Sequence, residues 1–165
     1  RDAPLWDFIA ASSLPKIDDF SPQRLANTAW SIARIPYFNG PLLDALSVAS
    51  ILTLRDARPQ ELSSTAWAFA KLRFCNQPLR EAIAEASLAK IAEADAHNLS
   101  ITFWAYAKLA FDHPPLLEAM SAASLSIIEE FGGQDICNTV WAFATLQVVD
   151  IPLLNALAAG ASSLG

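Results

Sequence analysis

The stretch LSSTAWAFAKL, residues 62–72, is one of four copies of a pattern that returns every 37 residues along the chain. Its counterparts occupy residues 25–35, 99–109 and 136–146, with no insertion or deletion between them. The interval is kept by the tryptophans Trp30, Trp67, Trp104 and Trp141 and by the prolines Pro4, Pro41, Pro78, Pro115 and Pro152. A constant period of this length is typical of stacked supersecondary units.

Each unit has the pattern of a helical hairpin. In the unit that starts at Asn39, the asparagine is a good helix N-cap and Pro41 falls within the first turn. Apolar residues at three- and four-residue spacing then predict a first helix to about Asp56, and a second helix starts near Pro59. The cap position of the five units is occupied by Asp2, Asn39, Asn76, His113 and Asp150.

The units predict an all-α protein, a right-handed α-solenoid of about four and a half helical-hairpin repeats. We expect a single array over residues 1–165. Its units fall at about 2–38, 39–75, 76–112 and 113–149, with a partial unit at 150–165. We further expect the array to be a piece of a longer chain, because residue 165 falls within a unit.

Composition narrows the class of protein. Hydrophobic residues make up 53% of the chain, which suits internal repeats that bury two faces. The uncharged run 136–149 has 14 residues and is shorter than a membrane span, so we expect no membrane insertion. With two cysteines there is no disulfide framework, and no targeting peptide is visible. The net charge of −6 disfavours indiscriminate nucleic-acid binding but allows a locally basic surface.

The second helix of each unit is expected to pack on both sides. Its apolar and small residues cover an arc of about 220° at 100° per residue. The narrow arc that is left holds the first, fourth, eighth and eleventh residues, counted from Arg24 in the first unit and from the equivalent residue in the others. In the first two units these are Arg24, Asn27, Ser31 and Arg34, then Glu61, Ser64, Ala68 and Lys71. We predict that these four columns form the exposed strip.

The second-helix motif resembles a known family. Residues 20–30, FSPQRLANTAW, have echoes in RPQEL at 58–62 and NTVWAFA at 138–144. The pattern is similar to the octotricopeptide repeat, a degenerate array of helical pairs found in organellar proteins. The resemblance covers essentially the whole chain. One departure is the 37-residue period, in place of 38. Another is the stretch AHNLSI at residues 96–101, where Ala-His replaces the Pro-Gln of the motif and isoleucine replaces its Asn.

The resemblance implies sequence-specific binding of single-stranded RNA in a chloroplast or mitochondrion, in support of transcript stability, processing or translation. Repeats of that family are not catalytic. A different class of function is also open at this point, a protein-interaction scaffold or structural subunit of a larger assembly, which the acidic balance favours. A third possibility is that the repeats tether an enzyme domain outside this sequence.

One column carries positive charge. Arg34, Lys71 and Lys108 share it, and Thr145 takes the fourth place. Stacked repeats would align these cations, so that an RNA backbone could follow them with one base per repeat. The alternative is that each cation lies over the tryptophan four residues earlier, because residues i and i+4 are neighbours on a helix.

Two further columns are candidates for contacts with bases, and two are expected to pack. Asn27, Ser64, Ile101 and Asn138 are variable and one turn from tryptophan, so the polar members could contact base edges. Arg24, Glu61, Asn98 and Asp135 also vary, but they fall in the first turn, where acids also suit the helix dipole. We expect the tryptophans to form the structural repeat core rather than stack on bases. The column Thr28, Thr65, Thr102 and Thr139 should pack, with its hydroxyls bonded back to the helix.

Acidic residues indicate which face RNA would avoid. They recur early in the first helices and again at their ends, at Asp44, Glu81 and Glu118, then at Asp19, Asp56, Glu93 and Glu130. No catalytic constellation is visible, since His97 and His113 fall in different columns and Cys75 has no histidine partner nearby in sequence. We therefore expect no enzyme activity, no metal, no cofactor and no small-molecule substrate.

Overall fold

The computed structural model describes residues 3–35 and 38–163, and these ranges contain nine α-helices and no strand. The helices are α1 (Ala3–Ser13), α2 (Pro22–Arg34), α3 (Gly40–Thr53), α4 (Pro59–Lys71), α5 (Gln77–Ala89), α6 (Ala96–Lys108), α7 (Pro114–Ser126), α8 (Gly133–Leu146) and α9 (Ile151–Ser163). The predicted all-α class is confirmed. None of the described helices is both long and apolar enough to cross a membrane.

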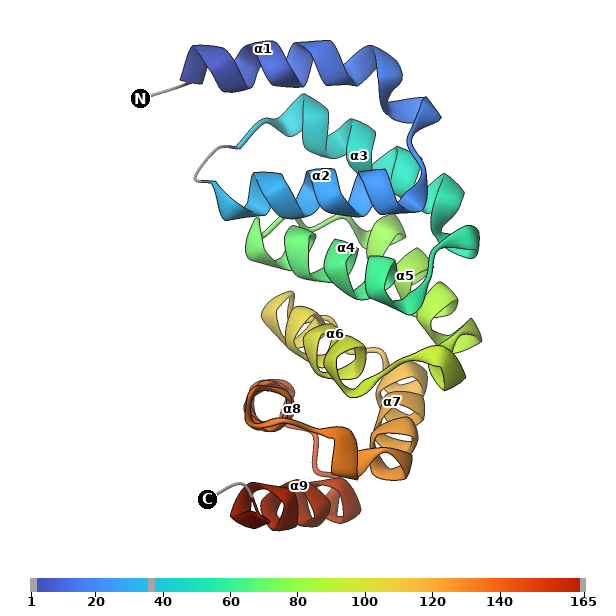
Figure 1. Cartoon of the computed structure of the whole chain (residues 1–165), viewed down its shortest axis with the longest axis vertical. Helices are drawn as coiled ribbons and strands as arrows, with labels where there is room; N and C mark the ends of the chain where they lie inside the picture. Colours follow the sequence, from blue (N-terminus) through green and yellow to red (C-terminus); the bar gives the residue numbers. More distant parts are fainter. Residues whose placement is uncertain (1–2, 36–37, 164–165) are drawn as a thin grey trace.

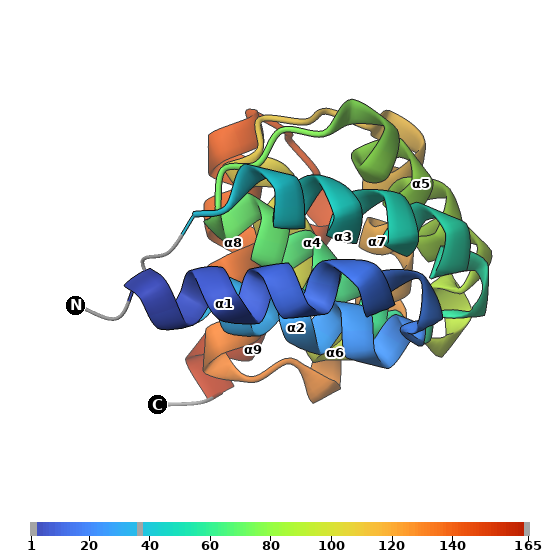
Figure 2. The same cartoon turned by 90° about the horizontal axis from the view of Figure 1, so that it is seen from above.

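The helices form two layers. The second helices of the units, α2, α4, α6 and α8, lie side by side in one layer, and α3, α5, α7 and α9 follow one another in the other (Figures 1 and 2). Neighbours within the second-helix layer approach one another much more closely than neighbours in the first-helix layer. The orientation of successive units changes steadily, so α2 is seen from the side and α8 almost end-on in Figure 1.

Capping residues set the starts of the first helices. The side chains of Asn39, Asn76 and His113 accept hydrogen bonds from backbone N–H groups three residues later, at 3.0, 2.9 and 3.2 Å. Asp150 does the same for Leu153 at 3.0 Å. The predicted cap column is therefore confirmed at these four positions, while Asp2 lies outside the described residues. Each cap satisfies a donor that the first helical turn would leave free.

The first helices end earlier than predicted. α3 stops at Thr53, and residues Leu54–Asp56 form a short 3₁₀ segment that leads into α4. Similar segments follow α1, α5 and α7, at Leu14–Asp19, Ile91–Glu93 and Ile128–Glu130. The tighter turn redirects the chain within a few residues, which the 3.6-residue periodicity of the apolar stripe does not indicate.

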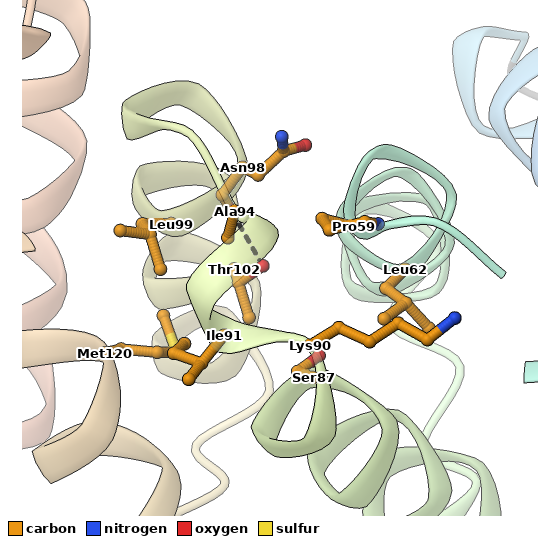
Figure 3. A pocket seen from close by; sticks show the side chains of 10 residues that line it. All are labelled: Pro59, Leu62, Ser87, Lys90, Ile91, Ala94, Asn98, Leu99, Thr102 and Met120. Atoms are coloured by element: carbon orange, nitrogen blue, oxygen red, sulfur yellow. Dashed lines mark hydrogen bonds between the residues drawn. The ribbon is translucent and has the colours of Figure 1, made fainter. Parts of the chain in front are cut away.

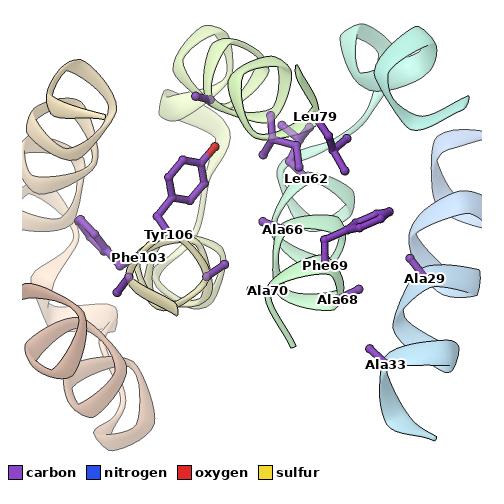
Figure 4. Close-up of a cluster of buried hydrophobic side chains, with 14 of the residues drawn as sticks. Ala29, Ala33, Leu62, Ala66, Ala68, Phe69, Ala70, Leu79, Phe103 and Tyr106 are labelled. Carbon is purple, nitrogen blue, oxygen red and sulfur yellow. The ribbon is translucent and has the colours of Figure 1, made fainter. Parts of the chain in front are cut away.

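Small residues allow the close packing of the second helices. Ala68, Ala105 and Ala142 occupy one column and are fully buried, and Ala33, Ala70 and Ala107 of another column are buried as well. Figure 4 shows Ala33, Ala68 and Ala70 among the larger core side chains, of which Phe69 and Phe103 are fully buried. An alanine at each crossing lets two helix backbones approach, while the phenylalanines fill the space between the layers.

Tyr106 introduces a polar group into this core. Its hydroxyl donates a hydrogen bond of 2.9 Å to the carbonyl oxygen of Arg80, and the ring lies 5.5 Å from that of Phe111. Burial raises the pKa of Tyr106 above its usual value, although the nearby Arg80 guanidinium acts in the opposite direction. The folded state therefore holds the phenol proton at pH values where an unfolded chain has lost it.

Stability should fall in alkali because of Tyr106. Above pH about 10 the unfolded state binds fewer protons at this residue than the folded state, so the free energy of unfolding decreases as pH rises, by up to about 1.4 kcal/mol per pH unit. Tyr106→Phe should be less stable at pH 7 by about 0.5–1.5 kcal/mol for the lost hydrogen bond, yet have a shallower decline above pH 10. Urea unfolding of both proteins at pH 7, 10 and 11 measures this. Tyr37 is the only other tyrosine and is common to both, so parallel declines would contradict the assignment.

Candidate nucleic-acid interface

From α4 onward, two of the four columns predicted to be exposed are buried or half-buried between repeats. Glu61 and Asn98 of the first column are buried, and so are Ala68 and Ala105 of the eighth position. The prediction was wrong at these residues because their columns face the second helix of the preceding unit. Hydrogen bonds between neighbouring helices show this contact: Ser63 Oγ donates to Asn98 Oδ1 at 2.9 Å, and Ser100 Oγ donates to Asp135 Oδ1 at 2.7 Å.

The first unit differs from the others. Arg24 and Ser31 are exposed, and Thr28 is half-buried, whereas the matching residues of the later units are mostly buried. On this side α2 borders a hollow of about 310 Å³, lined also by Trp6 and Ile9 of α1. Arg24 is thus exposed, but its column belongs to the contacts between repeats rather than to a continuous surface.

The free surface of the second-helix layer is formed by four columns, two of which, those of Asn27 and Arg34, were predicted to be exposed. On α2 they are Gln23, Asn27, Trp30 and Arg34. On α4, α6 and α8 they are Gln60, Ser64, Trp67 and Lys71, then His97, Ile101, Trp104 and Lys108, then Gln134, Asn138, Trp141 and Thr145. Steps of four, three and four residues keep each set on one side of its helix. We call these sixteen positions the second-helix face.

The glutamine and tryptophan columns were missed as surface positions. Trp30 and Trp141 are 44% and 42% exposed, while Trp67 and Trp104 are half-buried and pack against the core. Only the two central tryptophans thus contribute substantially to the repeat core that the sequence predicted. The glutamines had a sequence signal, since Gln23, Gln60 and Gln134 return at the same place in the repeat.

The predicted cation column lies on the surface. Arg34, Lys71 and Lys108 are all exposed at the carboxyl-terminal ends of their helices. The Arg34 guanidinium carbon is 5.3 Å from the Trp30 ring centroid, so the predicted cation–π contact exists there. Within the described ranges, no such contact is found between Lys71 or Lys108 and a tryptophan. Both lysines therefore extend their charge into solvent.

The tryptophan rings associate in two pairs. Trp30 and Trp67 have ring centroids 6.2 Å apart with an interplanar angle of 32°, and Trp104 and Trp141 repeat this at 6.1 Å and 31°. Among the described residues, no ring contact joins Trp67 to Trp104. The aromatic column is thus divided into two platforms, one at each end of the second-helix face.

Polar groups line the amino-terminal half of the face. Asn27 is exposed, whereas Ser64, Ile101 and Asn138 are half-buried. Gln134 Nε2 donates to Asn138 Oδ1 at 2.9 Å. Ile101 interrupts this column, so the third unit has no hydrogen-bonding side chain at this position. The neighbouring threonines are packed as predicted, and Thr65, Thr102 and Thr139 donate to carbonyls four residues earlier at 2.7, 2.8 and 2.8 Å.

The second-helix face has no carboxylate among its sixteen positions, and one carboxylate that contacts it is Asp135, whose Oδ1 lies 3.4 Å from His97 Nδ1. Glu61 is buried, and its carboxylate pairs with Arg58. The carboxylate oxygens accept hydrogen bonds from the Arg58 backbone N–H at 2.6 Å and from the Arg58 guanidinium at 2.6 and 2.9 Å. The acidic columns on the first helices and 3₁₀ segments are exposed, as at Asp44, Glu81 and Glu130. Cations without a carboxylate beside them in the column pattern therefore recur on the second-helix face, where an anion would meet favourable charge.

The described part of the chain has cavities of very different volumes. Figure 3 shows one between α4, the end of α5 and α6, with a volume of about 20 Å³, enough for about one water molecule. Most of its lining is apolar, and Lys90 Nζ is already bonded to the Ala57 carbonyl oxygen at 2.5 Å. No group of three potential metal ligands occurs in the residues that the structure describes. His97 Nδ1 lies 3.4 Å from Asp135 Oδ1, and His113 serves as a helix cap.

The fold and the second-helix face define a class of protein, a helical-hairpin repeat protein with a cationic, tryptophan-bearing surface. Residues 49–164 match the family model described as RNA-editing substrate-binding complex 6 protein, and the chain belongs to that family. A comparison with curated proteins finds no match. The octotricopeptide resemblance does not conflict with this family and stays a hypothesis.

Proposed function

We propose that the chain is a right-handed α-solenoid that binds single-stranded RNA along its second-helix face, as a subunit of an RNA-editing substrate-binding assembly. The observation that carries the proposal is the exposed cation column, Arg34, Lys71 and Lys108, on a face without carboxylates. Sequence preference would come from the amides of Gln23, Asn27 and their equivalents, because amides can hydrogen-bond the edges of unpaired bases. The family description, which names RNA editing and substrate binding, supports the same class of ligand.

The proposal also states in which compartment the protein acts and whether it catalyses a reaction. We propose a role in organellar RNA metabolism, and of the two organelles that the sequence resemblance implied we retain the mitochondrion. We also propose that the repeats themselves bind and position RNA without catalysing a reaction. Any chemical change of the RNA would then be made by a partner.

A titration at two salt concentrations tests RNA binding. A fluorescently labelled single-stranded RNA of about twelve nucleotides should bind, and affinity should fall about 20-fold between 50 and 200 mM salt if three phosphates are neutralised. The same sequence in a duplex should bind less tightly, because its bases cannot reach the face. Absence of binding at 50 mM salt, or equal affinity for the duplex, would contradict the proposal.

A scaffold function is the second candidate, and a specific surface favours it. Val48 and Leu52 on α3 are 56% and 75% exposed, and Phe8 on α1 is 70% exposed. Large apolar side chains on the first-helix layer suit a protein partner better than RNA. The two functions use different layers, so one subunit of an assembly could serve both.

A further inference from the structure

We propose that Trp30 and Trp141 are stacking platforms for RNA bases, supported from behind by Trp67 and Trp104. The inference rests on the proposed RNA-binding function and adds to it the residues that contact bases and the number of stacked bases, two. It differs from the sequence-based expectation, in which the tryptophans serve only as core.

Exposure of the rings is the first observation. Close packing of the second helices places alanine at the crossings, and the indole at the adjacent position is displaced to the margin of the layer. In each pair one ring is half-buried and packs on the core, and the other leaves about two-fifths of its surface in solvent. A large aromatic surface held in one orientation and open to solvent is what base stacking needs.

Pairing of the rings is the second observation. The contacts at 6.2 and 6.1 Å, with nearly the same tilt, fix each exposed indole against its neighbour. A base that stacks on the exposed ring therefore loses little side-chain entropy on the protein side. Because no ring contact joins Trp67 to Trp104 among the described residues, the structure offers two separate platforms rather than a continuous column.

Charge identifies the ligand as a nucleic acid rather than an apolar peptide. Arg34 lies over Trp30, and Lys71, which makes no cation–π contact within the described residues, is exposed at the equivalent position four residues after Trp67, so each tryptophan of the first pair is followed by a cation. A nucleotide stacked on Trp30 would have its phosphate within the field of both cations. The second platform has Lys108 on one side and the neutral Thr145 on the other.

The amides distinguish the platforms further. At the first platform, Asn27 is exposed one turn before Trp30, and Gln23 lies one turn before Asn27. At the second, Gln134 and Asn138 are bonded to each other. We therefore expect the first platform to contribute more to affinity and to base preference than the second.

Tryptophan emission provides a direct test. The chain has five tryptophans, and Trp6 on α1 is the only one outside the second-helix face, so Trp6→Phe is used as the background. Single-stranded RNA should quench the emission of this protein with the same midpoint as binding followed by labelled RNA. RNA of equal length with abasic sites should bind less tightly and quench less, because it keeps the phosphates but has no bases to stack.

Substitutions locate the platform. Trp30→Ala should raise Kd about 5- to 140-fold, the range expected for one lost base–aromatic stack, and Trp141→Ala should raise it by less. Trp30→Phe should recover part of the affinity because it keeps a ring. Trp6→Ala is the matched control, and its Kd should stay within about twofold of the wild type.

The experiments distinguish failure of base stacking from failure of RNA binding. If wild-type protein binds intact RNA but its emission does not change, or if abasic RNA binds equally well, base stacking on the tryptophans is wrong while RNA binding stands. If Trp30→Ala folds and binds like the wild type, the assignment of the platform is wrong. If intact RNA does not bind at low salt, the proposed function itself fails. A peptide that quenches the same tryptophans where RNA does not would assign the face to a protein ligand.

Discussion

Replacing Phe103 by alanine is expected to destabilise the fold by about 3–5 kcal/mol, the cost of a large cavity in a core that cannot collapse fully. Phe103 is fully buried on α6, and its ring lies 5.1 Å from that of Phe143 on α8 at an angle of 58°. The substitution therefore removes a contact between the third and fourth units as well as buried area. The midpoint of thermal unfolding should fall by roughly 6–20 °C for a chain of this size.

Phe8→Ala is the matched control, since it makes the same chemical change on α1 where the ring is 70% exposed. Its effect on stability should stay within about 0.5 kcal/mol. The loss in Phe103→Ala should also be local, because each repeat contacts only its neighbours. Hydrogen exchange should accelerate most in α6 and α8 and least in α2. Equal destabilisation by the two substitutions, or uniform acceleration along the chain, would show that the repeat interface does not hold the fold in this way.

The period made most of the fold predictable. Once Asn39 and Pro41 are recognised as the start of a helix, the interval places every other start, and the structure shows caps at Asn76, His113 and Asp150. The ends of the first helices were less predictable. Apolar residues continue through the 3₁₀ segments, as at Leu54, so the hydrophobic pattern extends beyond the α-helix.

The surface was predicted only in part, for a physical reason. A wide apolar arc indicates that a helix is packed on two sides, but it does not say which residues stand at the crossings. Size suggested that Trp67 should be buried and that Ala68 could be exposed, and the structure shows the reverse order of burial. Helices that approach closely need a small residue at the point of contact, so alanine is buried there and tryptophan moves to the margin.

The same effect explains Asn98 and Asp135. As polar, variable residues they were plausible contacts for RNA, yet each accepts a hydrogen bond from a serine of the preceding unit. Both partners are serines, Ser63 and Ser100, and a serine hydroxyl can donate to an amide oxygen as well as to a carboxylate oxygen, so Asn98 and Asp135 make the same contact although they differ. Variation between repeats therefore identifies an interface between units as readily as a ligand-binding position.

Replacing Lys71 and Lys108 together by alanine is expected to weaken binding of single-stranded RNA by about 25-fold at 0.1 M salt. This value assumes that each lysine neutralises one phosphate. For a single strand, log K then changes by about 0.7 per phosphate for each tenfold change in salt concentration. The slope of log K against log salt concentration should become shallower by about 1.4. Both lysines are exposed and neither contacts a tryptophan in the described part of the chain, so the loss should leave the fold intact.

Lys16→Ala with Arg55→Ala is the matched control, because it removes the same net charge from exposed positions on the 3₁₀ segments. If only the total charge of −6 mattered, both double variants would lose affinity equally. If the second-helix face binds the backbone, the control should keep both its affinity and its salt slope nearly unchanged. Equal losses would therefore exclude a localised path for RNA, whereas a loss confined to Lys71 and Lys108 would place the backbone beside the two tryptophan platforms.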